Sequence, residues 1–347
     1  MSIPTDTCDD SIHYPSLAIV VNNYNYARYL REALDSALKQ MREGDEMIVV
    51  DDGSTHESPT ILRQYQAAHG IKLIEQKNQG QMRTVRVGID AAVADVIVLL
   101  DSDDYFLDGY LDRLRQIYQQ HPEINYVFCN ALVTSSPGVD SADMRDVLDR
   151  MELTPGKVGS TKWATLLFYE FVGVPTSGNS LHRSLANAIA TLPVSIDATE
   201  ALSPIIAPLL GISKIEQHKS GFTADGVIVR CASLLGALKY YDDRPGFVYR
   251  IHGSNKYAAT TRLGRWYLRH RRKALFERMV RQHFGLSTAP TVAELRAEVL
   301  GRSFGRILIR RVFIRTKYSM AVLTSRGTLA QKVAALAAAL GLFRREQ

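Results

Sequence analysis

The sequence predicts an α/β protein with a mostly parallel central sheet flanked by helices and with a helical extension at the C-terminal end. Three observations lead to this prediction. Short apolar runs alternate with segments of helical periodicity over residues 17–100, and the links between them are short. The five apolar residues 96–100 suit a strand that is buried on both faces of a parallel sheet. A chain of 347 residues with 46% hydrophobic content can build one large domain or two smaller ones.

The elements of the first half follow in order. Apolar runs predict strands over residues 17–21, 47–50, 72–75 and 96–100. Apolar residues spaced three and four apart predict helices over residues 29–40, 59–69, 80–94 and 111–119. Because a helix follows each strand, right-handed crossovers are expected, and with them parallel strands.

The pattern loosens after residue 101. We expect a strand over residues 126–133, a polar excursion over the surface at 135–159, and an apolar stretch with aromatic residues at 163–171. A turn and helix over 221–236 and a last strand over 247–251 complete the first region. The chain then divides into a sheet-containing domain, residues 1–255, and a basic helical region, residues 256–347.

Charge is spread unevenly. The net charge is +6, but residues 255–347 hold 20 Lys and Arg against 4 Asp and Glu, a net of +16. The rest of the chain is therefore acidic, with a net of −10. Such asymmetry indicates an anionic partner for the C-terminal region: a membrane lipid, a nucleic acid or an anionic substrate.

Composition also argues against several classes of protein. Cys8, Cys129 and Cys231 lie far apart and match no metal or redox spacing, so we expect reduced thiols in a cytoplasmic protein. Residues 1–14 carry three aspartates and no apolar core, so no signal peptide is expected there. No window approaches 18 uninterrupted apolar residues, so no membrane-spanning helix is expected.

Three carboxylates, Asp101, Asp103 and Asp104, follow the apolar run 96–100. Carboxylates crowded at a strand end repel one another and raise each other's pKa. A hard divalent cation among them relieves that repulsion, since oxygen ligands suit Mg²⁺ and Mn²⁺. The alternative is an acidic loop that caps the next helix.

Polar residues also follow two other predicted strands: Asn22 after the first, and Asp51 with Asp52 after the second. Ligands of open α/β sheets bind at the carboxyl ends of the strands, so a nucleotide with its metal fits this edge. The chain has no Gly-x-Gly-x-x-Gly after its first strand and no Gly-Lys-Ser/Thr, which argues against the dinucleotide and phosphate-loop folds.

Seven short motifs in this order resemble glycosyltransferase family 2, which has the GT-A fold, in its bacterial polysaccharide branch. They are residues 20–25 (VVNNYN), 48–55 (IVVDDGST), 78–81 (NQGQ) with 88–89, 100–104 (LDSDD), 175–179 (PTSGN), 224–226 (ADG) and 249–255 (YRIHGSN). The resemblance covers residues 16–255 and implies a transfer of sugar from a nucleoside-diphosphate sugar, UDP-sugar above all, with Mn²⁺ or Mg²⁺. It also implies inversion at the anomeric carbon and a hexosyl or N-acetylhexosaminyl group.

The resemblance implies a role for each of several positions. Asp225 would be the catalytic base that takes the proton of the acceptor hydroxyl. Asp103 and His252 would bind the metal, and Asn179 and Arg250 would lie on the acceptor or diphosphate side. The nucleotide-binding positions would be Asn22, Tyr24, Asp51, Asp52, Gly80, Arg86, Asp101 and Ser102. The chain has Ala224 where many relatives have a glutamate before the base, which leaves the identity of the donor open.

Each role has a structural alternative. Asp52 before Gly53 suits a turn residue, and Asp225 before Gly226 suits a helix N-cap. His252 suits a surface or structural residue, and Asn179 suits a cap of the helix that begins near residue 183. At the level of the whole protein, the alternatives are a sugar-phosphate nucleotidylyltransferase and a catalytically inactive glycan- or lipid-binding protein. The first would need a Gly-rich basic loop after the first strand, and residues 22–29 lack one.

The basic region 256–347 alternates cationic and apolar residues over 265–281 and 305–315. A basic amphipathic helix can lie on an anionic membrane surface, which would suit a lipid-linked or glycan acceptor and a peripheral position at the inner face of the membrane. The alternatives are packing on the body of the protein or a homodimer contact. Nucleic acid is not expected as a partner, because no recognition fold accompanies the charge.

Overall fold

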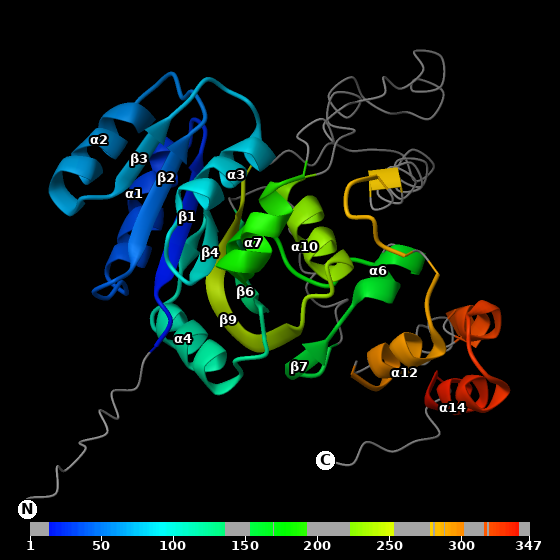
Figure 1. Cartoon of the computed structure of the whole chain (residues 1–347). Coiled ribbons are helices and arrows are strands. Elements are labelled where there is room, and N and C mark those ends of the chain that lie inside the picture. Colours follow the sequence, from blue (N-terminus) through cyan, green and yellow to red (C-terminus); the bar gives the residue numbers. More distant parts are fainter. Residues whose placement is uncertain are drawn as a thin grey trace, which may run out of the picture.

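The computed structural model describes residues 14–135, 153–168, 170–192 and 223–252, and parts of the C-terminal region (Figure 1). Those parts are residues 278–279, 282–287, 289–301, 316–317 and 319–339. The predicted boundary between residues 255 and 256 and the amphipathic run 305–315 lie outside the described residues, as does nearly all of the run 265–281.

A mixed sheet organises the described part of the first 252 residues, with nine strands in the order β3-β2-β1-β4-β8-β6-β9-β5 and β7 beside β9. The strands are β1 (Leu17–Asn23), β2 (Glu46–Asp51), β3 (Lys72–Glu75), β4 (Val96–Asp101), β5 (Tyr105–Phe106), β6 (Tyr126–Ser135), β7 (Gly156–Gly159), β8 (Asn179–His182) and β9 (Lys239–Ile251). β1 to β4 are parallel to their neighbours among themselves, and β9 is parallel to β6. β8, β5 and β7 pair antiparallel with their neighbours. The predicted α/β class is confirmed.

Helices cover both faces of this sheet. The first face carries α1 (Ala27–Leu38), α2 (Ser58–His69) and α4 (Tyr110–Gln120). The second carries α3 (Gln81–Ala91), α6 (Lys162–Phe168), α7 (Arg183–Ala190) and α10 (Ala224–Leu234). In β1, Leu17, Ile19 and Val21 pack on the first face, whereas Ala18 and Val20 pack on the second. Side chains alternate in direction along a strand, so a continuous apolar run serves two cores at once.

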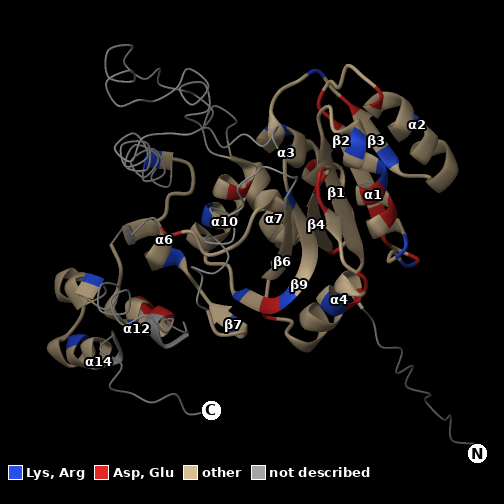
Figure 2. Ribbon diagram, turned by 180° about the vertical axis from the view of Figure 1, so that it is seen from behind, with Lys and Arg blue, Asp and Glu red and all other residues tan. Residues whose placement is uncertain are grey.

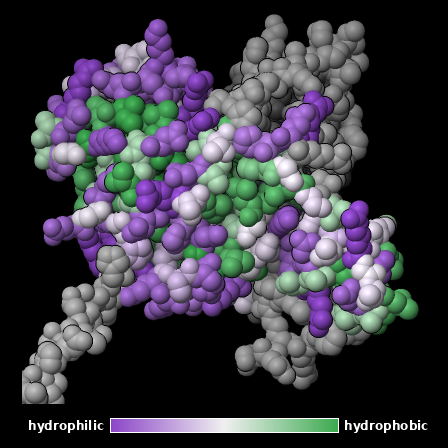
Figure 3. Space-filling model, viewed as in Figure 1, coloured by the Kyte–Doolittle hydropathy of each residue, from purple (hydrophilic) through white to green (hydrophobic). Residues whose placement is uncertain are grey.

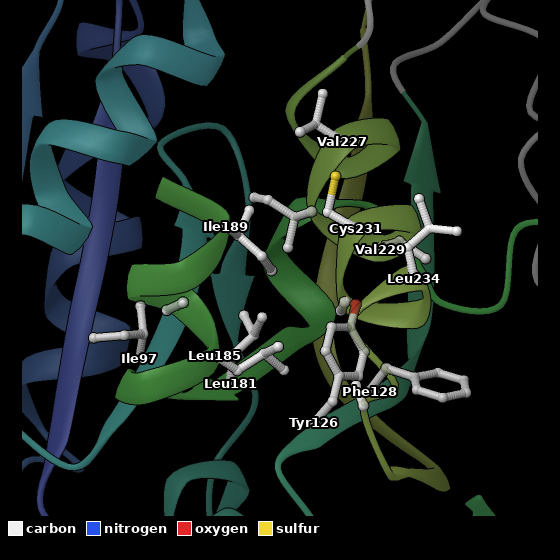
Figure 4. Packing of buried hydrophobic residues seen from close by; sticks show 14 of the residues in the cluster. Ile97, Tyr126, Phe128, Leu181, Leu185, Ile189, Val227, Val229, Cys231 and Leu234 are labelled. Atoms are coloured by element: carbon white, nitrogen blue, oxygen red, sulfur yellow. The ribbon is translucent and has the colours of Figure 1, made fainter. Parts of the chain in front are cut away.

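The second core joins the two halves of the sheet. Figure 4 shows Ile97 of β4, Tyr126 and Phe128 of β6, and side chains of α7 and α10 packed together. Ile189 and Val229 are fully buried there. This packing fixes α10 against the strands.

The second half differs from the sequence-based expectation in two places. β9 begins at Lys239 rather than residue 247, and β7 lies within the stretch predicted as a surface excursion. The reason is pairing: β9 lies between β6 and β7 and bonds to both, so a segment with charged residues, such as Asp242 and Asp243, is still a strand. The expected excursion at 136–152 lies outside the described residues.

The helix predicted over 80–94 is shorter than expected. α3 ends at Ala91, and Ala92 has an extended backbone. The carboxylate of Glu46 accepts the backbone N–H groups of Val93 and Ala94 at 2.6 and 2.7 Å. At the middle of α3, a Cβ on Gly88 would stand 2.3 Å from Cγ1 of Val20. Glycine therefore allows α3 to lie close to β1.

The C-terminal region contains α12 (Val292–Gly301) and α14 (Leu329–Ala339), which contact each other. α12 also contacts β7 and α6, so this part of the region packs on the body of the protein. None of the helices within the described residues is both long and apolar enough to cross a membrane.

A buried ion pair holds the edge of the sheet at which β1 begins. Arg115 of α4 is almost fully buried and pairs with Asp45, and its Nη1 donates to Asp112 at 2.7 Å. Asp45 also accepts the backbone N–H of Leu17 at 2.9 Å and that of Arg42 at 2.8 Å. One carboxylate thus ties α4 to the start of β1.

Replacing Arg115 should therefore destabilise the fold strongly. We expect Arg115→Ala to lower the free energy of unfolding by about 3–5 kcal/mol, because Asp45 would remain charged and buried. Urea denaturation of the purified protein measures this. The control is Arg63→Ala, which breaks an exposed pair with Glu75 and should cost less than about 1 kcal/mol. Equal losses in the two variants would contradict the role given to Asp45 and Arg115.

Candidate nucleotide and metal site

The carboxyl ends of the parallel strands bring the predicted polar residues together. In the register of the sheet Asn22 pairs with Asp101, and Asn23 pairs with Asp51. Figure 2 shows acidic segments, in red, near the end of the sheet at which β1 and β2 finish. The strand order places residues of β1, β2 and β4 next to one another although up to 79 positions separate them in the chain.

An acidic cluster lies at the end of β4. Asp101, Asp103 and Asp104 each offer one carboxylate oxygen, and these oxygens all lie within 4.8 Å of one another. Burial raises the pKa of Asp101 to about 7, and the charge of Asp103 adds to the rise. Burial, followed by the charges of Asp103 and Asp101, raises the pKa of Asp104 well above its usual value. A set of crowded oxygen donors suits a divalent cation such as Mn²⁺ or Mg²⁺.

Asp104 has a different set of partners from the other two carboxylates. Its Oδ2 accepts a hydrogen bond of 2.5 Å from the hydroxyl of Ser177, and its Oδ1 accepts the backbone N–H of Arg250 at 3.0 Å. The same Ser177 hydroxyl accepts the backbone N–H of Asp101 at 3.0 Å. Asp104 therefore ties the end of β4 to the 3₁₀ helix η1 (Thr176–Gly178) and to β9. Asp101 and Asp103 remain as the members of the cluster that can face a ligand.

Aromatic rings surround His252 beside this cluster. Nε2 of His252 lies 3.1 Å from Oδ2 of Asp103. The imidazole stacks on Tyr29, with ring centroids 5.2 Å apart, and meets the edge of Tyr26 at 5.5 Å. Only 6% of His252 is exposed, so the surface alternative is wrong. Burial, followed by the charge of Asp103, raises the pKa of the Tyr26 hydroxyl above its usual range, which places that hydroxyl near the cluster.

Arg250 brings a positive charge to the same place. Its guanidinium lies over Tyr105 and Tyr29, 4.7 and 5.0 Å from the ring centroids, and pairs with Glu32. Nη1 also donates to the backbone carbonyl of Asp103 at 3.4 Å. The structure thus places Arg250 beside the cluster.

The two carboxylates after β2 have backbone and side-chain partners. Asp51 is 2% exposed and accepts hydrogen bonds from Asn23 Nδ2 at 2.6 Å and from the hydroxyl of Ser54 at 2.6 Å. The Ser54 hydroxyl also accepts the backbone N–H of Asn25, so Asp51 and Ser54 join the loops after β1 and β2. This network gives Asp51 a structural task beside the nucleotide role predicted for it.

Asp52 holds the loop before α3. Its Oδ1 accepts Gln79 N at 2.8 Å and Gln76 Nε2 at 2.7 Å, and its Oδ2 accepts Gly80 N at 2.8 Å. Gly80 has a φ of 91°, a backbone conformation that favours glycine. The described bonds of the Asp52 carboxylate organise the loop at residues 76–80 rather than the turn at Gly53. Oδ1 already accepts two hydrogen bonds, whereas Oδ2 accepts one and keeps a lone pair for a further donor.

An open pocket of about 570 Å³ lies beside these loops. It is lined by Asp51, Gly53, Ser54, Pro59, Arg63, Glu75, Gln76, Lys77 and Asn78. A Cβ on Gly53 would stand 2.8 Å from the backbone nitrogen of Asn78, so glycine lets the loops after β2 and β3 approach each other. The pocket has the polar lining that a base or ribose requires.

Unpartnered polar atoms lie next to the acidic cluster. Asn22 Oδ1 and Ser102 Oγ are buried and have no hydrogen-bond partner among the described residues. A buried polar atom without a partner is costly, so a ligand or an ion that bonds to it would stabilise the site. Tyr24 is 39% exposed at the same edge, where a base can stack on its ring.

Two predicted site residues have structural partners instead. Asn179 is fully buried: its Oδ1 accepts the hydroxyl of Tyr126 at 2.6 Å, and its Nδ2 donates to the carbonyl of Pro175 at 2.7 Å. These contacts hold a turn and give no support to an acceptor-side position for Asn179. Arg86 donates to the carbonyl of Leu192, just after α7, at 3.1 Å and lies 3.7 Å from Asp90 of its own helix α3. The described contacts of Arg86 give no support to its predicted nucleotide contact.

Asp225 lies in the first turn of α10 and is half-buried. The N-cap of this helix is Thr223, whose hydroxyl accepts the backbone N–H of Gly226 at 3.3 Å, so the N-cap alternative for Asp225 is wrong. The charge of Asp225 contributes to the raised pKa of Asp101, so the two carboxylates lie within electrostatic range of each other. Asp225 thus stands near the acidic cluster.

A buried lysine holds α10 in this position. Nζ of Lys239 donates to the carbonyl of Val172 at 2.6 Å, to that of Val229 at 3.2 Å and to the hydroxyl of Ser233 at 2.8 Å. Lys239 is fully buried, so these bonds are made in a medium of low dielectric. They tie the middle of α10 to the start of β9, which leads on to Arg250 and His252.

Several residues that shape the site were not among the predicted site residues. Tyr26 and Tyr29 surround His252, Gln81 donates to Asp101 at 2.9 Å, and Ser177 orders the acidic turn. In the sequence, Tyr26 and Tyr29 belong to a group of aromatic residues that follows the first strand, and this group is the signal that could have pointed to them. No sequence pattern marks Lys239, because two of its three partners are backbone carbonyls, which any residue type supplies, and Val172 is 67 positions away in the chain.

Comparisons with known proteins indicate a family for this chain. Residues 18–161 match the family model of glycosyl transferase family 2. An uncharacterized glycosyltransferase of Nostoc sp. is 29% identical over 245 residues, which cover 70% of this chain and 66% of the relative. An uncharacterized glycosyltransferase of Haemophilus influenzae is 32% identical over 141 residues, which cover 37% of this chain and 56% of the relative. The chain thus spans less than two thirds of the length of these curated relatives.

A solved structure shares the fold. Mannosyltransferase PcManGT from Pyrobaculum calidifontis, solved in complex with GDP-Man and Mn²⁺, superposes with a TM-score of 0.51 at 16% identity. The match covers 96% of this chain and 77% of that chain. The predicted GT-A type of fold is confirmed.

The raised pKa of Asp101 leads to a prediction for metal binding. Below about pH 7 the Asp101 carboxyl of the metal-free protein holds a proton, which a cation must displace. The affinity for Mn²⁺, measured by isothermal titration calorimetry, should therefore fall roughly tenfold per pH unit below 7 and level off above it.

Variants test the assignment of this pH dependence. Asp101→Asn should remove most of the affinity, whereas Asp108→Asn, at an exposed carboxylate after β5, should leave both the affinity and its pH profile unchanged. An affinity for Mn²⁺ that is constant between pH 5 and pH 8 would contradict the assignment.

Proposed function

We propose that the chain is a member of glycosyltransferase family 2 and an inverting, metal-dependent glycosyltransferase that uses a nucleoside-diphosphate sugar; the match of residues 18–161 to the model of this family supports the proposal. The observation that carries the proposal is the acidic cluster with Asp101 and Asp103 at the end of β4, with Asp225 of α10 within electrostatic range of Asp101. A donor with its cation needs the first two carboxylates, and deprotonation of an acceptor needs the third.

The nucleotide would lie along the strand ends. The base and ribose would occupy the pocket beside Asp51 and the loop held by Asp52, with Tyr24 at its rim. The unpartnered Asn22 Oδ1 and Ser102 Oγ lie beside the acidic cluster, where they would bond to ribose or to a metal-bound water. We infer a UDP-sugar as the donor class, with a hexosyl or N-acetylhexosaminyl group.

The diphosphate would lie between the acidic cluster and Arg250. Asp101 and Asp103 would hold Mn²⁺ or Mg²⁺, with His252 as a further ligand or as the hydrogen-bond partner that orients Asp103. When bound, the cation offsets the charge that develops on the departing diphosphate. Mn²⁺ is held with GDP-Man in the mannosyltransferase of the same fold, which supports a metal of this class. The guanidinium of Arg250, fixed between Tyr29 and Tyr105, would stabilise the same charge.

Asp225 would act as the base. Its carboxylate would take the proton of the acceptor hydroxyl while the hydroxyl oxygen forms a bond to the anomeric carbon. The bond from that carbon to the diphosphate oxygen breaks as the new bond forms on the opposite face, so the configuration inverts. Lys239 would keep Asp225 at the required position by fixing α10.

The acceptor would be a hydroxyl of a glycan or of a lipid-linked sugar. The half-buried position of Asp225 in the first turn of α10 leaves room for such a group on its exposed side. Synthesis of a bacterial polysaccharide would be the setting. A nucleotidylyltransferase is not supported, because the family match lies over the nucleotide-binding half of the chain and no basic glycine-rich loop follows β1.

The direct test is donor turnover. Purified protein with Mn²⁺ and a panel of sugar nucleotides should release nucleoside diphosphate from one of them. Asp225→Asn should lower that release by about 10²- to 10⁴-fold, because the base is lost, while binding of the same nucleotide persists. Asp243→Asn, at an exposed carboxylate of β9, is the matched control and should keep full activity.

The remaining outcomes separate the alternatives. Release that survives Asp225→Asn would contradict the role of Asp225. Pyrophosphate released from a sugar phosphate and a nucleoside triphosphate would indicate a nucleotidylyltransferase. Metal-dependent protection from heat by one nucleotide, without turnover of any donor, would indicate an inactive binding protein.

A further inference from the structure

The C-terminal helices carry an exposed apolar surface. Met320, Leu323, Leu329 and Val333 are 64%, 60%, 78% and 58% exposed, and we call these four residues the C-terminal apolar face. Eight large hydrophobic side chains are exposed among the described residues, and half of them fall within these fourteen positions. Figure 3 shows apolar side chains gathered at the outer end of these helices. The opposite side of the same helices is buried, which makes them amphipathic.

The spacing of the four residues is helical. Met320 and Leu323 lie three positions apart in a helical segment, and Leu329 and Val333 lie four positions apart in α14. Val322 and Ala335, between and beyond them, are each 1% exposed and belong to the core. The apolar face is therefore a second stripe, on the side that does not pack against α12.

The described segments that carry this face, residues 316–317 and 319–339, hold Lys317, Arg326 and Lys332 and no acidic residue, whereas α12 beside α14 carries Glu294 and Glu298. Residues 301–345 contain ten Lys and Arg and no Asp or Glu. Figure 2 shows a basic residue and no acidic one on α14. Arg326, in the turn between the two helical segments, is exposed beside the apolar face. An apolar stripe whose own helical segments carry cations and no carboxylate is complementary to a lipid bilayer, which has an apolar interior beneath an anionic headgroup layer.

The face is attached rigidly to the half of the protein that holds Asp225. The carboxylate of Glu298 in α12 is 3% exposed and accepts the backbone N–H groups of Trp163 and Ala164, both at 2.8 Å. Both N–H groups belong to the first turn of α6, and α6 packs against α10. Lys162 adds an ion pair of 3.7 Å with Glu294. A contact made by the C-terminal apolar face would therefore fix the orientation of α10 relative to whatever it touches.

We propose that the C-terminal apolar face docks on the surface of a lipid bilayer that contains anionic lipid. The four side chains enter the boundary between headgroups and acyl chains, and the surrounding cations bind the anionic headgroups. The complete lack of acidic residues over residues 301–345 favours a membrane over a protein partner, because protein interfaces pair charges of both signs. This inference rests on the face and its charge and does not depend on the proposed transfer reaction.

The test is flotation of the full-length protein with lipid vesicles. The protein should bind vesicles of phosphatidylcholine with phosphatidylglycerol, bind vesicles of phosphatidylcholine alone much more weakly, and dissociate as salt is added. The double variant Leu329→Ser, Val333→Ser should lower the partition coefficient by roughly tenfold or more, because it removes two apolar side chains from the buried contact. Arg326→Gln should lower it by about fivefold.

The controls separate docking through this face from lipid binding elsewhere on the protein and from loss of folding. Val93→Ser with Leu132→Ser changes two exposed apolar residues elsewhere and should leave vesicle binding unchanged. The double variant at Leu329 and Val333 should keep the far-UV spectrum and thermal unfolding of the parent, since its side chains are exposed. It should also keep the heat stabilisation by a donor nucleotide, which reports on the proposed function separately.

Two results would overturn the inference. One is equal binding of the parent protein to both kinds of vesicle, or binding that the double variant keeps in full. The other is a dimer, measured by light scattering without lipid, that the same double variant converts to a monomer, since the face would then be covered by a second copy of the chain.

Discussion

Mutual repulsion of carboxylates at the end of β4 is the constraint around which the site is arranged. Asp101, Asp103 and Asp104 stand within 4.8 Å of one another, and burial strengthens their repulsion. The fold tolerates this because the strand that leads to them is buried on both faces and cannot move away. Hydrogen bonds from Ser177 and from the backbone of Arg250 then stabilise Asp104. What remains is a pair of carboxylates, Asp101 and Asp103, whose excess negative charge a divalent cation relieves.

The same bonds connect three parts of the chain that would otherwise be independent. β4, η1 and β9 meet at Asp104, and β9 continues to His252 and begins at Lys239, which holds α10. A ligand that draws Asp101 and Asp103 together therefore acts on a framework that already includes Asp225. The acidic cluster and α10, which carries Asp225, are thus linked through the continuous strand β9 and its side-chain contacts.

The first half of the fold could be predicted from sequence because its signals are local. The apolar residues of β1 to β4 pack into the two cores on either face of the sheet. Polar residues follow each strand because the chain leaves the core there. The second half could not be predicted as well. β9 carries Asp242 and Asp243, and β7 is only Gly156–Gly159, so their strand character comes from pairing with β6 and with each other. Pairing is non-local, and no periodicity records it.

In the site, too, the sequence predicts residue types at the sheet edge, but it does not predict the contacts that those residues make. Asp103, His252 and Arg250 lie together because the motifs that carry them end strands at the same edge. Asn179 has the residue type of a ligand contact, yet its amide holds a turn, and only the positions of Tyr126 and Pro175 decide this. Asp51 and Asp52 share one dipeptide but hold different loops. The sequence therefore locates the polar residues at this edge of the sheet. Which of their oxygens still has a lone pair for a ligand depends on the hydrogen-bond donors near each oxygen, and only the structure shows those donors.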